Sequence, residues 1–454
     1  MSATGDLASY VSDLTYESLP ESTVAAAKRV TLDLLGVVIP AVNYGPGQVL
    51  TEYVRSIGGN PTATVVGTDL VTSTANAAMV NGTMAADMEQ DDVHPESNLH
   101  ASSVFVPALL AVAEDNDVSG QEWITALVAS YDVGCRLSIA MDNGRQYARG
   151  FHPTAVSGIF GATAGASRLL KLDAAGVNSA IGLAGCQAAG MLTWEMEQEH
   201  YTKSFQSGVP ARNAVVAAEL AARGYVGAED TLDGRYNVFD AFSTHRNFER
   251  LVEGLGERYE IEYTGYKFYS VCRFIHSALD VVLELAEEHG FAADDVEGIT
   301  VWLPETMAPI VDNNFLTTHN LQFAVAVGLH DRVIERAQTT SDRRADPVVN
   351  ELASRIELLP DADLEKLYPQ HWPARVHLRL KDGRDFEVER EDPRGTAGRP
   401  VTDQDIENKF MQMVTQVISE EQAREIVKTV DNLETLTSIR DLTALLRVTP
   451  GDAG

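Results

Sequence analysis

The residues between positions 89 and 100 could bind or move protons. Acidic residues and histidines crowd this short stretch: Glu89, Asp91, Asp92, His94, Glu96 and His100. Helical patterns of small residues flank it, so we expect a loop held between two helices, and one too polar to belong to the core. In a chain this acidic, a solvated acidic connector is the alternative interpretation.

Two further segments carry groups of the same kind. His152, in GFHPT, stands directly before a predicted helix, whose N-terminus would favour anions and lower the pKa of an imidazole. A capping or core histidine is the alternative. Lys203, in HYTKSFQSG, precedes a small-residue helix and could equally be an ordinary exposed lysine at a helix start.

The segment YKFYSVCRFIHSALD concentrates more polar groups. It holds Lys267, Cys272, Arg273 and His276 within ten residues, and the edge of an amphipathic helix is the alternative interpretation. No GxGxxG, P-loop, GxSxG or HExxH motif occurs. Nucleotide binding and the common hydrolase triads therefore lack support.

Composition limits the partners and cofactors. The net charge of −31 opposes binding to nucleic acid or to an anionic membrane. Cys135, Cys186 and Cys272 lie far apart with no C-x-x-C pair, which argues against zinc ribbons, iron–sulfur ligation and a disulfide framework. Arginine greatly outnumbers lysine among the 35 basic residues, and we interpret this acidic, lysine-poor composition as a salt-adapted surface.

The sequence also predicts a location. No run of eighteen or more apolar residues occurs, so no transmembrane helix is expected. The N-terminal residues MSATGDLASYVSD are acidic and lack a basic region followed by an apolar block. We therefore expect no secretory signal and a cytoplasmic protein.

Hydrophobic periodicity separates a helical part from an α+β part. At 454 residues and 44% hydrophobic, the chain can bury two cores. Helical spacing dominates up to Tyr263 and again from Pro400. Between these points, residues 298–303 alternate as a strand, and residues 374–391 read as a hairpin that turns at Asp382-Gly383. We expect a mainly α fold with an α+β insertion.

Particular helices must position the candidate residues. A helix over residues 73–84 leads into the acidic stretch, and a second runs from Val104 to Glu114. Ser102 or Ser103 would cap the second helix, with Pro107 in or near its first turn. Glycines inside helical patterns cost about 1 kcal/mol each and predict closely packed helices; they are Gly158, Gly161, Gly165, Gly182, Gly185 and Gly190.

Taken together, these segments resemble the MmgE/PrpD family, which includes 2-methylcitrate dehydratase and cis-aconitate decarboxylase. The likeness rests on ordered motifs over nearly the whole chain: KRVTLDLLG, NGTMAADMEQDDVH, LHASSVFVPALLAVAE, GFHPTAVSGIFGA, IGLAGCQAAG, TKSFQSG, YKFYSVCRFIHSALD and PRGTAGRP. It implies a large all-helical domain built from residues 1–264 and 400–454, with an inserted smaller α+β lid domain of residues 265–399. It also implies a homodimer and catalysis without a metal or an organic cofactor.

The resemblance assigns roles to residues of the cleft between these domains. It implies catalytic roles for Glu89, His100, His152 and Lys203. It implies substrate binding by Asp91, Asp92, Lys267, Cys272, Arg273 and His276. Departures from the family pattern weigh against decarboxylation of cis-aconitate: Glu89 for an aspartate, Val93 for a threonine, Ala101 for a proline, Gln206 for a histidine, Cys272 for a histidine and Phe323 for a tyrosine.

We expect a lyase that removes a proton α to a carboxylate of a di- or tricarboxylate, most simply a dehydratase of the 2-methylcitrate type. Such a reaction needs fixed positive charge on that carboxylate and a base within reach of the proton. The two site lysines and Arg273 could supply the charge. His100 and His152 could act as acid and base in either order, with Glu89 or Asp92 orienting an imidazole.

Other functions stay open at this point. The same residues could decarboxylate or epimerise a related dicarboxylate. The substitutions in the family motifs also allow a binding protein without catalytic activity. A metal-dependent hydrolase would use oxygen and nitrogen ligands from the acidic stretch, namely Asp91, Asp92, His94 and His100.

Overall fold

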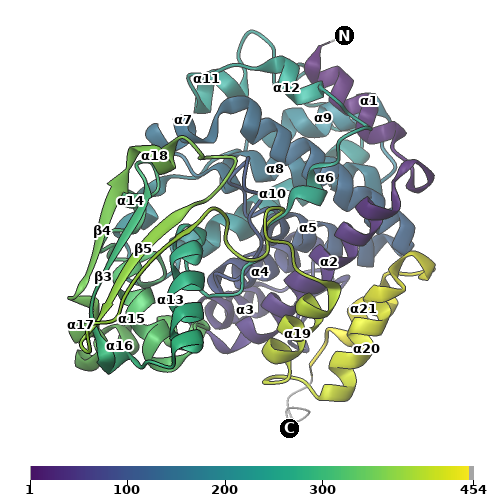
Figure 1. The fold of residues 1–454 in the computed structure, drawn as a ribbon. Helices are drawn as coiled ribbons and strands as arrows, with labels where there is room; N and C mark the ends of the chain where they lie inside the picture. The colour runs from purple at the N-terminus through teal and green to yellow at the C-terminus, as the bar shows by residue number, and fades with distance from the viewer. Residues whose placement is uncertain (1, 449–454) are drawn as a thin grey trace.

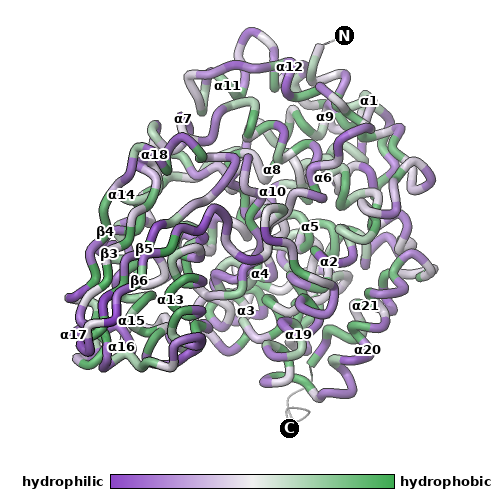
Figure 2. Tube along the Cα trace, in the orientation of Figure 1, coloured by the Kyte–Doolittle hydropathy of each residue, from purple (hydrophilic) through white to green (hydrophobic). Residues whose placement is uncertain are grey.

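The computed structural model describes residues 2–448. Within this range the fold is mainly α, as predicted, with 21 α-helices and six strands in two small sheets (Figure 1). Buried hydrophobic side chains form two clusters, one among residues 7–266 and 406–446 and one among residues 271–380 together with Val93. Figure 2 shows hydrophobic residues along the interior helices and hydrophilic residues along the outer loops.

The first cluster is built largely from the N-terminal helices. Their bounds are α1 (Ala3–Asp13), α2 (Glu21–Val38), α3 (Gly45–Ile57), α4 (Thr74–Asp87), α5 (Ala101–Asn116), α6 (Gly120–Met141), α7 (Asn143–Ala148), α8 (Pro153–Leu169), α9 (Ala174–Gly185), α10 (Thr202–Ala222), α11 (Val238–Phe242) and α12 (Phe248–Val252). Helices α4, α5, α8 and α10 pack against one another at the centre, and α6 packs along α8. Strands β1 (Ala63–Thr64) and β2 (Val71–Thr72) form a short antiparallel pair.

Helix α6 is a long, mostly buried helix of this cluster. Its start is fixed by a capping box, in which Ser119 and Glu122 each bind the other's backbone N–H. By length and composition α6 would also suit a membrane span, but 94% of its most apolar window is buried inside the protein. Core helices share this property, so α6 reads as core.

Glycines of α8 let the central helices approach closely, as predicted for Gly158, Gly161 and Gly165. For the others the prediction is wrong: Gly182 and Gly185 of α9 pack against the loop at residues 228–231, and Gly190 lies outside the helices. A Cβ built on Gly161 of α8 would lie 2.5 Å from the ring of Phe105 in α5, closer than any real contact. The backbones of α5 and α8 therefore depend on the missing side chain. This close packing fixes the N-termini of both helices relative to each other.

The second cluster includes the buried side chains of a four-stranded sheet. Its elements are α13 (His276–His289), β3 (Val296–Pro304), α14 (Ala308–Val311), α15 (Leu321–Asp331), α16 (Ser341–Arg344), α17 (Pro347–Ala353), β4 (Ile356–Asp361), α18 (Ala362–Glu365), β5 (Ala374–Leu380) and β6 (Asp385–Arg390). The strand order is β4-β3-β5-β6, with β3 parallel to β4 and antiparallel to β5. The predicted strand and hairpin are confirmed. Strand β4 was not predicted, because IELLPD neither alternates nor avoids proline.

After the sheet, the described chain returns to the helical cluster (Figure 1). Helices α19 (Asp403–Val414), α20 (Glu420–Asp431) and α21 (Arg440–Leu445) follow the sheet, and α19 packs on α2. Lys409 of α19 is buried, where it pairs with Asp33 (2.7 Å) and donates to the carbonyl of Gln90 (2.9 Å). Helix α19 thus holds the backbone of the acidic stretch through Lys409.

Candidate active site

The acidic stretch connects α4 to α5 as a loop, as predicted, but this loop is buried. Glu89, Asp91, Asp92 and His94 are each no more than 1% exposed. The expectation that the stretch is too polar for the core is therefore wrong, and so is the alternative of a solvated connector. Burial is tolerated where side chains from distant parts of the chain neutralise or hydrogen-bond these groups.

Glu89 lies at the centre of a buried ionic cluster. Its Oε2 accepts from Lys203 Nζ (2.6 Å), its Oε1 accepts from Lys267 Nζ (2.9 Å), and Nε2 of His200 lies 2.7 Å from Oε2. Burial alone would raise the pKa of Glu89, but the charges of both lysines and the contact with His200 hold that pKa well below its usual range. Glu89 also adopts a φ of 52°, a costly backbone conformation that these contacts hold in place.

Two histidines lie beside this cluster, the partly buried His100 before α5 and the buried His152 before α8. Their ring centroids are 6.4 Å apart. Nδ1 of His100 lies 3.2 Å from Asp91 Oδ2, and Nδ1 of His152 lies 3.0 Å from Gln206 Oε1. Burial and the charge of Lys203 lower the pKa of His152 to about 3, whereas at His100 burial lowers the pKa against the opposing charge of Asp91. Both imidazoles are neutral at pH 7.

A small enclosed cavity lies between the two hydrophobic clusters. The helical side contributes Val93, Asn98, His100, Tyr147, His152, Trp194 and Lys203. The other side contributes Cys272, Arg273, Phe274, Ile310, His319 and Trp372. Its volume is about 30 Å³, roughly the room of one water molecule. A ligand larger than a few atoms therefore needs the two sides to move apart.

Trp194 occupies a central position in the cavity wall. Its ring lies 5.5 Å from that of His152 and 5.2 Å from that of His319, and Lys203 Nζ lies 5.6 Å from its centroid. Trp194 is 2% exposed, and its indole N–H has no hydrogen-bond partner among the described residues. A buried donor without a partner is costly.

Arg273 and Cys272 bring different chemistry to the opposite wall. Arg273 donates to the carbonyls of Tyr266 and Arg394, both at 2.8 Å, and burial lowers its pKa to about 10. Arg273 therefore stays charged at neutral pH. Burial and the negative charge of Glu89 raise the pKa of the Cys272 thiol to about 11, so it stays protonated and unreactive.

Not every predicted site residue reaches the cavity. Asp92 accepts from the backbone N–H (2.8 Å) and hydroxyl of Ser102 (2.6 Å) and from the hydroxyl of Tyr131 (2.5 Å), and burial raises its pKa to about 6. His276 contacts Arg273 and the carbonyl of Val271. Asp92 and His276 thus support neighbouring backbone and side chains. Asp91, Lys267 and Glu89 stand one layer behind the cavity wall.

The start of α5 differs from the prediction. The helix begins at Ala101, with His100 at its N-cap, and neither Ser102 nor Ser103 caps it. Ser102 is bound by Asp92 instead, and Pro107 lies inside the helix. The earlier start brings His100 to the N-terminus of a helix, where the local dipole disfavours its cationic form.

Four of the six residues that depart from the family pattern either line the cavity or contact a residue that lines it. Val93 and Cys272 line it, Glu89 binds the lysines, and Gln206 contacts His152. Ala101 is the first residue of α5. Phe323 is buried elsewhere, where the guanidinium of Arg344 lies 5.3 Å from its ring centroid.

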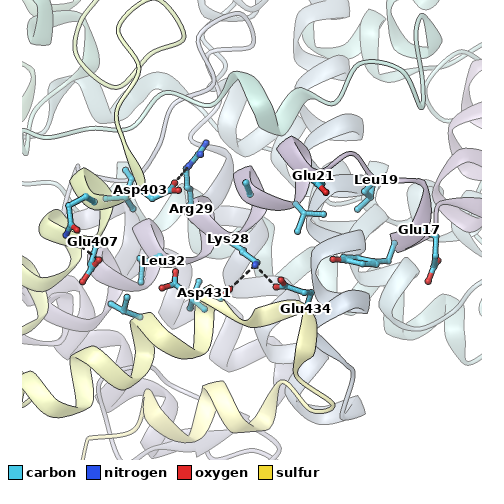
Figure 3. Close-up of a pocket in the computed structure, with 17 residues that line it drawn as sticks. Glu17, Leu19, Glu21, Lys28, Arg29, Leu32, Asp403, Glu407, Asp431 and Glu434 are labelled. Atoms are coloured by element: carbon cyan, nitrogen blue, oxygen red, sulfur yellow. Dashed lines mark hydrogen bonds and ion pairs between the residues drawn. The ribbon is translucent and has the colours of Figure 1, made fainter.

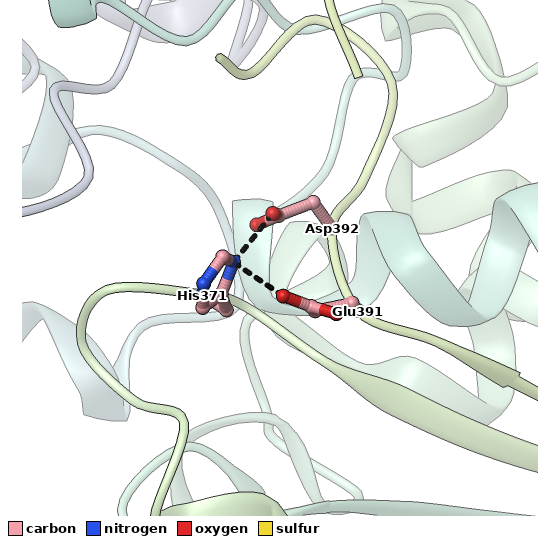
Figure 4. Close-up of side chains that lie close together, drawn as sticks. All are labelled: His371, Glu391 and Asp392. Atoms are coloured by element: carbon pink, nitrogen blue, oxygen red, sulfur yellow. Dashed lines mark hydrogen bonds and ion pairs between the residues drawn. The ribbon is translucent and has the colours of Figure 1, made fainter. Parts of the chain in front are cut away.

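Two of the residues proposed above as metal ligands, His100 and Asp91, contact each other, whereas His94 pairs with Glu260 and Asp92 with Ser102. Across residues 2–448, the group with ligand atoms in mutual reach lies just before β5 and just after β6: His371, Glu391 and Asp392 (Figure 4). Nδ1 of His371 lies 2.7 Å from Asp392 Oδ2 and 3.1 Å from Glu391 Oε1. One nitrogen meeting two carboxylates is the pattern of an ordinary charge-assisted hydrogen bond.

A larger hollow, of about 840 Å³, lies between α2, α19 and α20 (Figure 3). Both of its basic groups are paired, Lys28 with Glu434 (2.5 Å) and Arg29 with Asp403. The smaller cavity is lined instead by imidazoles, a thiol and a guanidinium whose pKa values burial shifts. We therefore place the chemistry in the smaller cavity.

Sequence reasoning missed several residues of the site, among them His200, Trp194 and His319. His200 touches Glu89, Trp194 and His319 line the cavity, and the rings of His200 and His319 are 6.4 Å apart. His200 stands one helical turn before Lys203, and that spacing was the available signal. No local pattern marks Trp194 or His319.

Family patterns match the chain over most of its length. The MmgE/PrpD N-terminal domain matches residues 5–251, and the MmgE/PrpD C-terminal domain matches residues 269–435. The chain belongs to the MmgE/PrpD family. The resemblance carried by the motifs is thereby confirmed.

Several similar proteins have names that mention one reaction. The cis-aconitate decarboxylase-like protein oryM of Aspergillus oryzae is 26% identical over 472 residues, covering 98% of this chain and 97% of the relative. The cis-aconitate decarboxylase of Mus musculus is 25% identical, covering 98% of this chain and 93% of the relative. That of Homo sapiens is also 25% identical, covering 98% and 95%.

Proposed function

We propose that this protein is a cofactor-independent lyase that decarboxylates a tricarboxylate of the aconitate type, and that residues 265–399 act as a lid over the cavity. One observation carries the proposal: two fixed cations, Lys203 and Arg273, and two neutral imidazoles, His100 and His152, line the same small cavity. The names of the relatives favour decarboxylation over the dehydration expected from the motifs.

Decarboxylation of such an acid needs a place for electrons and a source of one proton. When the bond between the methylene carbon and its carboxylate breaks, the released electron pair forms a new double bond to the central carbon. The former π pair moves to the carbon next to a remaining carboxylate, where negative charge builds. Lys203 and Arg273 stabilise that charge. An imidazolium then protonates the carbon, so one proton is consumed for each carbon dioxide released.

The apolar part of the wall assists the bond cleavage. Phe274, Ile310 and Trp372 face the cavity from the lid. A carboxylate placed against such a surface loses hydration, whereas neutral carbon dioxide does not need it. Closure of the lid would therefore favour the loss of carbon dioxide while the cations hold the other carboxylates.

Dehydration of a 2-methylcitrate-type acid is the second candidate, and one observation favours it. The contact with Gln206 leaves His152 with a free lone pair, as a base for an α-proton requires. Cys272 and Phe323, which stand where decarboxylases carry a histidine and a tyrosine, point the same way.

The test is incubation of the purified protein in high salt with cis-aconitate, 2-methylcitrate and citrate, followed by ¹³C NMR, with and without a chelator. We expect carbon dioxide and a methylene-substituted dicarboxylate from cis-aconitate, at the same rate after chelation. The Lys203→Met variant should be inactive, and Lys171→Met, at an exposed lysine, is the control. Loss of water from 2-methylcitrate without carbon dioxide would establish the dehydratase, and stabilisation by the acids without turnover would indicate a binding protein.

A further inference from the structure

The amide of Gln206 joins His152 to the backbone of a distant loop. Its Nε2 donates to the carbonyl of Met191 (2.7 Å), and its Oε1 lies 3.0 Å from Nδ1 of His152. A carbonyl oxygen only accepts hydrogen bonds, so the amide nitrogen must face Met191. The amide oxygen then faces His152, and this oxygen also only accepts.

These contacts fix the tautomer of His152. Because Oε1 of Gln206 is an acceptor, Nδ1 of His152 must carry the proton. In a neutral imidazole the other nitrogen then holds a lone pair. Nε2 of His152 is therefore an acceptor at the cavity and cannot donate a hydrogen bond to a substrate carboxylate.

Backbone hydrogen bonds also join the segment that carries His152 to the segment that carries Met191. The N–H of His152 donates to the carbonyl of Gly190 (3.1 Å), and the N–H of Leu192 donates to the carbonyl of Gly150 (3.0 Å). Phe151 and Met191 thereby pair as an antiparallel bridge. A Cβ on Gly190 would collide with Ala155 of α8, so the glycine is what allows this close approach.

His100 has the opposite kind of partner. Its Nδ1 lies 3.2 Å from the carboxylate of Asp91, which the contact with His100 keeps ionised by lowering its pKa against the effect of burial. A carboxylate stabilises an adjacent imidazolium, whereas a neutral amide does so far less. When a polycarboxylate adds negative charge to the cavity, His100 gains a proton more readily than His152.

We propose that Gln206 and Asp91 are positioning residues that divide the proton chemistry, so that His100 donates the proton to substrate and His152 is held as an acceptor. This inference rests on the proposed lyase function and names the acid within it. In decarboxylation His100 would protonate the product carbon from one face. In dehydration it would protonate the leaving hydroxyl while His152 takes the α-proton.

Charged and titratable groups around His152 set its pKa and therefore the pH at which it would gain a proton. Nearby titratable and charged groups come from the acidic stretch, from α7 and α10 and from the lid: Glu89, His100, Tyr147, Lys203, Cys272, Arg273 and His319. Lys203 disfavours the imidazolium of His152, and Glu89 favours it, with Lys203 the stronger. A new negative charge at position 206 would act on this balance directly.

The direct test is the ¹⁵N spectrum of the full-length protein labelled at its 11 histidines, with the signals of His152 identified by their loss in His152→Gln. We expect the Nδ1–H tautomer without titration between about pH 5 and 9. Gln206→Glu should raise the pKa of His152 into this range and add a matching limb to the pH profile of kcat. Gln206→Met should give a mixture of tautomers and lower kcat about tenfold with little change in KM.

A matched control is Gln404→Met, at an exposed glutamine of α19 outside the cavity, which should change neither the spectrum nor kcat. An Nε2–H tautomer of His152 in the unaltered protein would overturn the proposal, as would an unchanged tautomer and pH profile in both Gln206 variants. The spectrum of the unaltered protein decides the tautomer even where a variant fails to fold. If the panel of acids shows no turnover, the proposed function fails while the spectrum still decides the state of His152.

Discussion

The ionic cluster at Glu89 makes a prediction about stability. Replacing Glu89 by Gln removes the charge that Lys203 and Lys267 share, while both lysine side chains are no more than 5% exposed. Removing one partner of a buried ion pair costs about 3–5 kcal/mol. Lys267 keeps a hydrogen bond to the backbone carbonyl of residue 89 (2.8 Å), so we expect a loss near 3 kcal/mol in the free energy of unfolding at pH 7.

The sign of the pH dependence follows from the lowered pKa of Glu89. In the unfolded chain this carboxyl titrates near its ordinary value of 4.5, whereas in the folded protein it stays ionised well below that. Its contribution is therefore fully present above about pH 4.5 and is lost as the pH falls toward the folded pKa. The difference between the protein and its Glu89→Gln variant should shrink below about pH 4.5.

Urea unfolding followed by circular dichroism at pH 7 and pH 4 measures both quantities. Glu89→Asp keeps the charge and should lose less stability than Glu89→Gln. Glu199→Gln, at an exposed glutamate nearby, should change the free energy by less than about 0.5 kcal/mol. A loss below about 1 kcal/mol for Glu89→Gln at pH 7, or a loss equal at both pH values, would refute the ionic cluster as a stabilising unit.

Two further predictions concern catalysis and packing. His100→Gln should lower kcat by on the order of a hundredfold or more, and His152→Gln should cost clearly less if the reaction is decarboxylation; equal losses in steady-state assays would favour dehydration instead. Gly161→Ala should destabilise the protein by about 1–3 kcal/mol, because the new methyl group meets the ring of Phe105. Gly5→Ala in α1, where the nearest atom is 3.3 Å away, should be neutral or stabilising by up to about 1 kcal/mol in thermal unfolding, and a similar loss in both would contradict the close-packing argument.

Local sequence patterns predicted several elements. Helical spacing predicted α4, alternation predicted β3, and Asp382-Gly383 marked the hairpin turn. Helix ends were predicted less well. Helix α5 begins at Ala101, although the sequence offered Ser102 and Ser103 as N-caps. The competing partner of Ser102 is Asp92, ten residues earlier in a loop, and propensity alone does not show such a contact.

The sequence by itself determined which groups could do chemistry, and the family motifs picked out their positions. Only the tertiary structure decided which of them meet. Glu89 binds lysines 114 and 178 residues away, and Gln206 reaches His152 across 54 residues. Periodicity and turn signals act over a few residues, whereas such pairs form when helices close over a shared core. Burial then removes water from these charges and shifts their pKa values, so an acidic stretch that reads as surface becomes the buried support of a reactive cavity.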